Sequence, residues 1–156
     1  MIDSRLEKPG GFIDNSVHYF YKRIYFADTD AALVVYHAEY LRMAEQARTE
    51  MLRLKGFDYF FLKKTFNTHF AIHSLLIHYI KPLKIDDQII IETVIIALGG
   101  ASIKMIQNFY LIDKSDKKKV AKIEVKVVLV NHKGLLMRIP SDVNNILKPM
   151  VIKKDF

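Results

Sequence analysis

Residues 26–40 read FADTDAALVVYHAEY and form the junction around which the rest of the chain is organised. The segment that leads into them, Val17 to Phe26, is rich in Tyr, Phe, Ile and Val, which predicts a β-strand. The polar run Asp28-Thr29-Asp30 follows, and a long helix is predicted from about His37 to Lys55. We therefore expect a strand, a polar loop and a long helix in that order.

The predicted helix is amphipathic and has suitable residues at both ends. Glu39 falls in its first turn and Arg53 in its last, where their charges complement the helix dipole, and Gly56 suits a left-handed termination. A short second helix or turn is predicted from Asp58 to Lys64. The apolar stripe that should face the protein interior consists of Leu41, Ala44, Met51 and Leu52.

The rest of the chain is mostly predicted strand. Short connections between consecutive strands imply an antiparallel sheet, so the expected class is α+β, with five or six antiparallel strands and one long helix. Leu135–Ile139 is a candidate addition to the sheet edge, and Ser141 is the expected N-cap of a short C-terminal helix. The four long segments rich in Ile, Val and aromatic residues are His69–Ile80, Gln88–Leu98, Ser102–Ile112 and Val120–His132.

The length of the chain suits one domain. Its 156 residues are 51% hydrophobic, which favours a single packed core. We expect an irregular leader over residues 1–16, where Pro9-Gly10-Gly11 and Asp14-Asn15 interrupt regular structure, one domain over residues 17–150 and a tail over residues 151–156. One helix covers only part of so long a sheet, so self-association is expected to bury more of it.

Composition excludes several kinds of chemistry. Cysteine is absent, which rules out disulfides, Cys-zinc sites, iron–sulfur clusters and thiol catalysis. No apolar run approaches the roughly 18 residues of a membrane-spanning helix. The first residues also lack the apolar stretch of a secretory signal, so a soluble, cytoplasmic protein with no transmembrane segment is expected.

The net charge of +7 arises mostly in the second half of the chain, in a lysine cluster between Lys114 and Lys126. Such a cluster suits either a polyanionic ligand or a solvated hairpin tip. No nucleic-acid-binding motif accompanies it, so no nucleic acid partner is expected. His69 and His73 are four residues apart, but no third ligand has recognisable spacing, and we expect no metal.

The junction also contains groups that are able to catalyse a reaction. His37 lies near the predicted helix start, where unpaired N–H groups and the helix dipole can polarise a carbonyl and hold an oxyanion. A carboxylate from the other end of the loop can act on that carbonyl as a base or nucleophile, while His37 orients it, supplies a proton or activates water. The alternative is structural, with the aspartates as turn or cap residues and His37 solvated.

Several motifs together give a specific resemblance. The pattern D-T-D-A-x-x-V-V-Y-H-x-x-Y-L over residues 28–41, E-x-A-R-T-E over residues 45–50, Tyr79-Ile80-Lys81-Pro82 and Asp86-Asp87 resemble the hotdog-fold acyl-CoA thioesterases. Within them the chain is most similar to the Tol–Pal-associated subfamily related to 4-hydroxybenzoyl-CoA thioesterase, from about residue 18 to 148. The resemblance implies a hotdog fold, a sheet wrapped around a central helix, and hydrolysis of an acyl thioester to a carboxylate and a free thiol without a cofactor.

The resemblance also assigns roles by position. Asp30 matches the catalytic carboxylate, nucleophile or general base, and His37 matches the catalytic histidine, whose backbone N–H polarises the thioester carbonyl. Asp28 is expected to support the loop. Glu45 is either a substrate-facing carboxylate or the partner of Arg48 or Arg42 in a salt bridge. The residues expected to contact substrate are Val35, Tyr36, Glu45, Ser102 and Lys104.

Three positions depart from the subfamily. Ala32-Leu33 replace a common Gly-Gly, which reduces the backbone freedom of the loop. Phe26 replaces a frequent Tyr. The turn Gly99-Gly100-Ala101 lacks the Arg or Lys that relatives place near the coenzyme A phosphates, so Lys104 and the basic hairpin are the candidate replacements.

By the same resemblance, the partners are an acyl-CoA or acyl-carrier-protein substrate and a second copy of the chain. A homodimer or homotetramer is expected, with the site at a subunit interface. Two other functions stay open. One is a hotdog dehydratase or hydratase acting on acyl thioesters, and the other is a non-catalytic scaffold module that binds acyl carrier protein.

Overall fold

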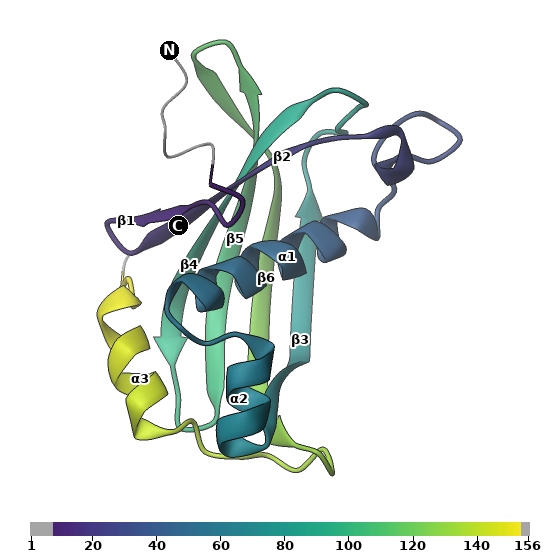
Figure 1. The fold of residues 1–156 in the computed structure, drawn as a ribbon. Coiled ribbons are helices and arrows are strands. Elements are labelled where there is room, and N and C mark those ends of the chain that lie inside the picture. Colours follow the sequence, from purple (N-terminus) through teal and green to yellow (C-terminus); the bar gives the residue numbers. More distant parts are fainter. Residues whose placement is uncertain (1–7, 154–156) are drawn as a thin grey trace.

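The strands form one antiparallel sheet that curves around a single long helix (Figure 1). The computed structural model describes residues 8–153. The six strands lie in the order β1-β2-β4-β5-β6-β3, which confirms the α+β class and the hotdog fold. Their bounds are β1 Phe12–Asp14, β2 Val17–Arg23, β3 Thr68–Tyr79, β4 Gln88–Leu98, β5 Ser102–Asp113 and β6 Asp116–Asn131.

Helix α1, Glu39–Leu54, crosses the concave face of the sheet and fills the core (Figure 1). Ala44 and Ala47 are fully buried, and their small side chains allow the sheet to approach closely. The buried face is completed by Tyr40, Met43 and Met51. The predicted apolar stripe is therefore confirmed for Ala44 and Met51. Leu41 lies at the exposed edge of that face, with 36% of its surface accessible.

Two shorter helices lie towards the same end of the sheet (Figure 1). Helix α2, Tyr59–Phe66, begins after Asp58, whose Oδ1 accepts the Phe61 N–H at 2.7 Å and caps the helix. Helix α3, Ser141–Leu147, continues into the 3-10 turn η3, Lys148–Met150. Ser141 is the first helical residue, and Pro140 occupies the N-cap position that the sequence assigned to Ser141.

The leader is more regular than expected. Residues 12–14 pair with β2 as strand β1, and the turn at Asn15 and Ser16 has positive φ at both residues, 47° and 67°, as in a tight hairpin. The prediction of irregular structure is therefore wrong for these residues, while residues 1–7 lie outside the described part. In the expected tail, the Ile152 N–H donates to the Ile95 carbonyl at 2.8 Å, and residues 154–156 lie outside the described part.

The lysine-rich run belongs to a strand and not to a turn. The β5–β6 hairpin turns at Lys114 and Ser115, Asp113 pairs with Asp116, and β6 continues from there. Lys117 forms an ion pair with Glu92 and lies 4.3 Å from the centroid of the Tyr110 ring. Strand β6 therefore begins at Asp116, four residues before the predicted start at Val120.

Strand β3 lies at one edge of the sheet and changes face in its middle. The register with β6 shifts between Ile72 and Ser74, which identifies a bulge at His73. Phe70 before the bulge and Leu75 and Ile77 after it all pack against the core. The bulge therefore keeps apolar residues on the helix side along the whole strand.

Candidate active site

The loop between β2 and α1 is held by a buried carboxylate. Asp28, 3% exposed, closes the 3-10 turn η2, Phe26–Asp28, and its Oδ2 accepts the Tyr25 N–H at 2.9 Å. Its Oδ1 lies 3.2 Å from Nη2 of Arg42 on α1, and its main-chain carbonyl accepts the Tyr36 N–H at 3.0 Å. These bonds tie both ends of the loop to the helix, so Asp28 has the supporting role expected of it.

Asp30 lies at the exposed turn of the same loop. Its main-chain N–H donates to the Val34 carbonyl at 3.0 Å, and its carbonyl accepts the Leu33 N–H at 2.9 Å. Its Oδ1 accepts the Ala32 N–H at 2.8 Å. One carboxylate oxygen thus fixes the turn, and Oδ2 has no hydrogen bond within residues 8–153.

His37 precedes the first residue of α1 by two positions. Its ring lies against the Tyr36 ring, with centroids 4.4 Å apart, and its main-chain carbonyl accepts a hydrogen bond from the Tyr79 hydroxyl at 2.8 Å. Tyr79 in turn packs edge-on against Tyr40, whose pKa is raised by burial. These contacts fix the helix start against the end of β3.

A hollow of about 270 Å³ opens beside this helix start. It is lined by residues of the loop, of α1, of the end of β3 and of the segment that follows β3, namely Val35, His37, Tyr40, Tyr79, Ile80, Lys81 and Pro82. The first N–H groups of a helix lack partners within the helix and form the positive end of its dipole. A carbonyl bound in this hollow would therefore meet favourable electrostatics. Asp30 is not among the residues that line it.

Only part of the predicted set is brought together. The loop gathers Asp30, Val35, Tyr36 and His37, whereas Glu45 lies two turns along α1 and accepts the Thr49 hydroxyl at 2.8 Å. The alternative role of Glu45, a salt bridge to Arg48 or Arg42, is absent among residues 8–153, since Arg42 pairs with Asp28 and with Glu39, the latter at 2.6 Å, and Arg48 donates to Gln107.

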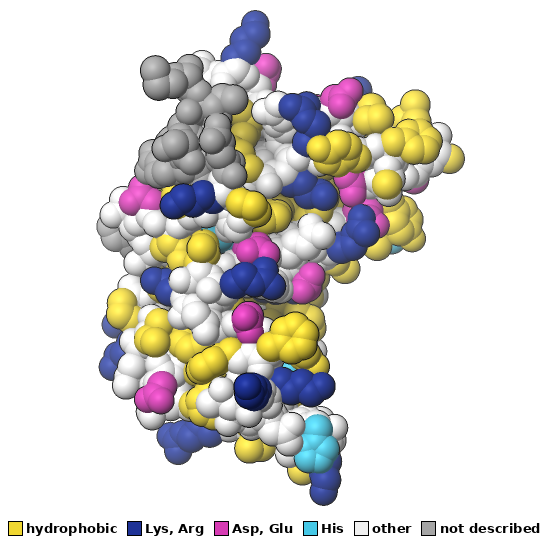
Figure 2. Space-filling model, viewed as in Figure 1, with side chains coloured by type: hydrophobic (Ala, Val, Ile, Leu, Met, Phe, Trp, Pro, Cys, Tyr) yellow, Lys and Arg dark blue, Asp and Glu magenta, His cyan; other side chains and the backbone are white. Residues whose placement is uncertain are grey.

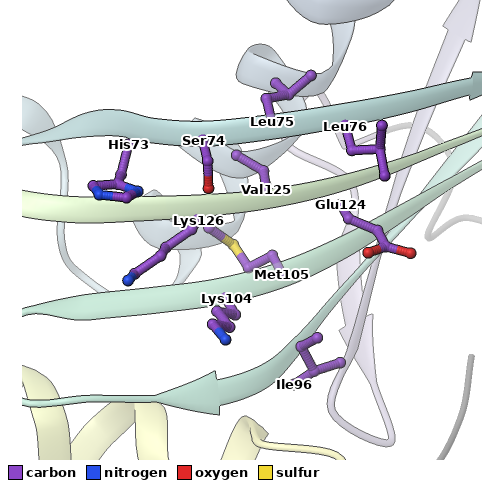
Figure 3. A pocket seen from close by; sticks show the side chains of 10 residues that line it. All are labelled: His73, Ser74, Leu75, Leu76, Ile96, Lys104, Met105, Glu124, Val125 and Lys126. Carbon is purple, nitrogen blue, oxygen red and sulfur yellow. The ribbon is translucent and has the colours of Figure 1, made fainter.

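The other two predicted contact residues lie away from the loop. Ser102 begins β5, next to the β4–β5 turn and remote from the Asp30 loop (Figure 1). Lys104 points away from α1, because its neighbours Ile103 and Met105 are in the core. It lines a separate hollow of about 390 Å³ on the outer face of the sheet (Figure 3). Within one chain, the structure does not join these residues to His37.

Sequence reasoning gave no role to Tyr79 and considered Arg48 only as a salt-bridge partner of Glu45. Tyr79 was quoted only as part of a motif, although its hydroxyl holds the main chain at His37. Arg48 is a buried residue of α1 and donates to Oε1 of Gln107 at 2.7 Å, and burial lowers its pKa to about 10. The Gln107 amide donates to the Ala44 carbonyl and the Thr93 hydroxyl, which anchors the helix to the sheet. The sequence signal for this role was the spacing: Arg48 follows Ala44 by four residues and so lies on the predicted apolar face of the helix.

The loop exposes apolar side chains. Figure 2 shows hydrophobic side chains gathered over the loop at the upper right. The most exposed of them are Tyr25 at 60%, Phe26 at 71%, Leu33 at 55% and Tyr36 at 44%. A cluster of this kind on one loop marks a surface that binds another molecule.

The part of the chain that the structure describes contains no helix long and apolar enough to cross a membrane. Across the same residues, no three His, Asp or Glu side chains are grouped so that they could hold a metal ion.

The fold and this loop define the class of protein. A six-stranded antiparallel sheet around one long helix is the architecture of hotdog thioesterases. Residues 24–147 match the thioesterase-like superfamily, and the chain belongs to this family.

Individual relatives agree. The acyl-CoA thioesterase YbgC of Haemophilus influenzae is 37% identical over 100 residues, which are 62% of this chain and 74% of the relative. The crystal structure of a probable thioesterase from Bartonella henselae has a TM-score of 0.71 at 32% identity and covers 80% of this chain and 99% of its own. A mutant of 4-hydroxybenzoyl-CoA thioesterase, complexed with 4-hydroxybenzoyl-CoA, has a TM-score of 0.79 over 84% of this chain and 98% of its own. At 18% identity, that match shows the fold alone.

Proposed function

We propose that the chain is a cytoplasmic enzyme that hydrolyses acyl-CoA thioesters to a carboxylate and free coenzyme A. Membership of the thioesterase-like superfamily and the acyl-CoA thioesterase among its relatives support this reaction. The observation that carries the proposal is the hollow at the start of α1, where His37 and Val35 lie beside the positive end of the helix dipole.

In the proposed mechanism, the thioester carbonyl binds in this hollow with its oxygen directed at the main-chain N–H of residue 37. The helix dipole stabilises the negative charge that develops on that oxygen. Using Oδ2, Asp30 either attacks the carbonyl carbon and expels the thiolate, which leaves an anhydride that water then cleaves to regenerate Asp30, or removes a proton from a water that attacks the carbonyl carbon and expels the thiolate. Oδ1 stays bonded to the Ala32 N–H in both routes. His37 orients the carboxylate or the water, and Val35 and Tyr36 contact the substrate. A thiolate is a good leaving group, so this set of groups is sufficient for hydrolysis.

We further propose that a second copy of the chain completes the site, in a homodimer or homotetramer. The turn with Asp30 is exposed, and Asp30 does not line the hollow beside His37 of its own chain. The same loop displays Tyr25, Phe26 and Leu33 to solvent. A partner subunit seated here would cover these side chains and bring further groups to the carbonyl, with Glu45 a candidate among them.

The test is thiol release from a panel of short, long and aromatic acyl-CoAs, run with the wild type, Asp30→Asn and His37→Ala. We expect thiol release by the wild type and a fall in kcat of at least about a hundredfold for Asp30→Asn, because the substitution removes the nucleophile or base. His37→Ala should also lower kcat. Asp142→Asn, which changes an exposed aspartate on α3, is the matched control and should turn over at the wild-type rate.

Three results would contradict the proposal. Thiol release by Asp30→Asn at the wild-type rate would remove Asp30 from the mechanism. An enoyl product without free thiol would identify a dehydratase instead, and binding of acyl carrier protein without any turnover would identify a scaffold module.

A further inference from the structure

We infer that Lys104 and Lys126, together with His73, bind the phosphates of the nucleotide end of coenzyme A on the outer face of the sheet. This inference rests on the proposed function, because it names the site for the part of the substrate that does not react. The three side chains come from three neighbouring strands, β5, β6 and β3, and line one hollow (Figure 3).

The first argument is an uncompensated pair of like charges. Lys104 on β5 and Lys126 on β6 are directly opposite each other in the strand register. Side chains paired in this way lie about 5 Å apart at Cβ, and like charges there destabilise a sheet. Neither lysine has an ion pair within residues 8–153, and the nearby Glu124 pairs with Lys122 at 3.2 Å. An anion bound between the two lysines would remove the repulsion.

The second argument separates this site from the lysine-rich hairpin, which is the other candidate for the phosphate contacts. Three lysines near the tip of the hairpin already have partners. Lys117 pairs with Glu92, Lys118 lies 3.8 Å from Asp116, and Lys119 lies 5.6 Å from the centre of the Tyr110 ring. Lys104 and Lys126 have no such partner among residues 8–153.

The shape of the hollow favours a small ligand. Its volume of about 390 Å³ falls in the range of small-molecule pockets, and Leu76 and Ile96 supply apolar surface beside the charged groups. His73 lies at the β3 bulge, which places its ring over the hollow next to Ser74 (Figure 3). Cations around a small, partly apolar hollow suit a nucleotide better than the broad surface of an acidic protein.

The third argument is the distance to the proposed reaction site. Ser74, which pairs with Lys126, precedes Tyr79 by five residues, and Tyr79 lines the hollow beside His37. Five residues span about 16 Å along a strand. The pantetheine arm of coenzyme A has about thirteen bonds between its sulfur and the nearest phosphorus, which extend to about 15 Å. The two hollows are thus separated along β3 by about the length of the arm that joins the two ends of the substrate.

The test measures binding of free coenzyme A by titration calorimetry, so that it does not depend on turnover. We expect Lys104→Ala/Lys126→Ala to weaken coenzyme A binding by about tenfold or more, and to reduce its dependence on salt, because two charge-assisted contacts are lost. Inhibition by pantetheine, which lacks the phosphates, should change by less than about twofold. Lys118→Ala/Lys119→Ala removes the same charge from the hairpin and is the matched control, expected to bind like the wild type.

A second variant guards against loss of the fold. Lys104→Gln/Lys126→Gln keeps most of the side-chain length and removes the repulsion, so it should retain the thermal stability of the wild type and show the same weakened binding. Coenzyme A binding that is unchanged in both double variants, weakened equally in the hairpin control, or absent in the wild type would overturn the inference. So would a loss of affinity confined to acyl carrier protein. If coenzyme A binding depends on the two lysines but no acyl-CoA is hydrolysed, the proposed function fails and this site stands.

Discussion

Leu33 bears the backbone strain of the loop that carries Asp30. Its φ is +59°, in the left-handed region, where a side chain with a Cβ costs about 1–2 kcal/mol relative to glycine. The conformation is required because the Leu33 N–H donates to the Asp30 carbonyl and closes the turn. Related sequences resemble this loop but commonly have Gly-Gly at Ala32-Leu33. From the sequence, this departure is expected to reduce the backbone freedom of the loop, and the structure shows the left-handed conformation at Leu33.

We predict that Leu33→Gly raises the free energy of unfolding by up to about 1 kcal/mol. Relief of the left-handed strain outweighs the extra entropy that glycine gives the unfolded chain, and the lost side chain is 55% exposed. Leu33→Val should lower the free energy by about 1 kcal/mol, because a β-branched residue tolerates this region least well. Urea unfolding of the three proteins checks both signs. A less stable glycine variant would show that the exposed leucine makes stabilising contacts.

The candidate site could be predicted from the sequence only where its residues are close together in the chain. Asp28, Asp30 and His37 lie within ten residues, and their spacing before a helix indicated both the supporting and the reacting group. Tyr79 is 42 positions from His37, and its bond to the His37 carbonyl depends on where β3 ends. Lys104 was a reasonable choice by charge, but the face to which it points depends on the pleat of β5, and that separates it from the loop.

Among the elements, strand β2 contains a buried histidine that links it to the segment before β1. His18 is 0% exposed, and its Nε2–H donates to the Gly10 carbonyl at 2.8 Å, which identifies the neutral form protonated at Nε2. Within the described residues, its Nδ1 is buried without a partner. Burial lowers the pKa of His18 below the ordinary value of 6.5, and the bond to Gly10 and the charge of Glu50 oppose that shift only in part.

We predict that the protein loses stability as the pH falls below 6.5 and that His18 causes part of this loss. In this range the unfolded chain binds a proton at His18 that the folded chain does not bind, so the folded state is favoured less at lower pH. One proton accounts for a slope of at most about 1.4 kcal/mol per pH unit. Urea unfolding at pH 7, 6 and 5 should give a shallower slope for His18→Gln than for the wild type. His78→Gln, at an exposed histidine, should keep the wild-type slope, and equal slopes for all three would contradict the prediction.

The long elements were predictable because each has a strong periodic pattern. Strand β4 begins and ends at the predicted residues, and α1 differs from the prediction by two residues at its start and one at its end. The errors lie where tertiary contacts override local preference. Strand β1 is only three residues long and depends on β2 for its pairing. The first residues of β6 were predicted to lie in the connection before the strand. The ion pair of Lys117 with Glu92 joins residues far apart in sequence, so the local pattern did not show it.

For the molecule as a whole, the distribution of exposed apolar residues supports the proposal that a second copy binds at the loop after β2. The loop after β2 and the end of β3 together display Phe26 at 71%, Tyr79 at 49% and Ile80 at 52% exposure. These residues surround the hollow at the start of α1 or the turn with Asp30. A surface that combines the reacting groups with exposed aromatic residues is typical of an interface that completes a site.

We predict that Phe26→Asp shifts the protein towards the monomer and lowers kcat/KM for acyl-CoA in parallel. A carboxylate at the centre of an apolar interface would be buried without a partner, which weakens association by several kcal/mol. Phe60→Asp is the matched control, since Phe60 is 77% exposed on α2, at the other end of α1 from the loop. Analytical ultracentrifugation across a concentration series gives the assembly state, and activity measured at the same concentrations shows whether turnover follows it. A wild type that is monomeric and fully active at every concentration would show instead that one chain holds a complete site, with Asp30 reaching the His37 hollow by movement of its own loop.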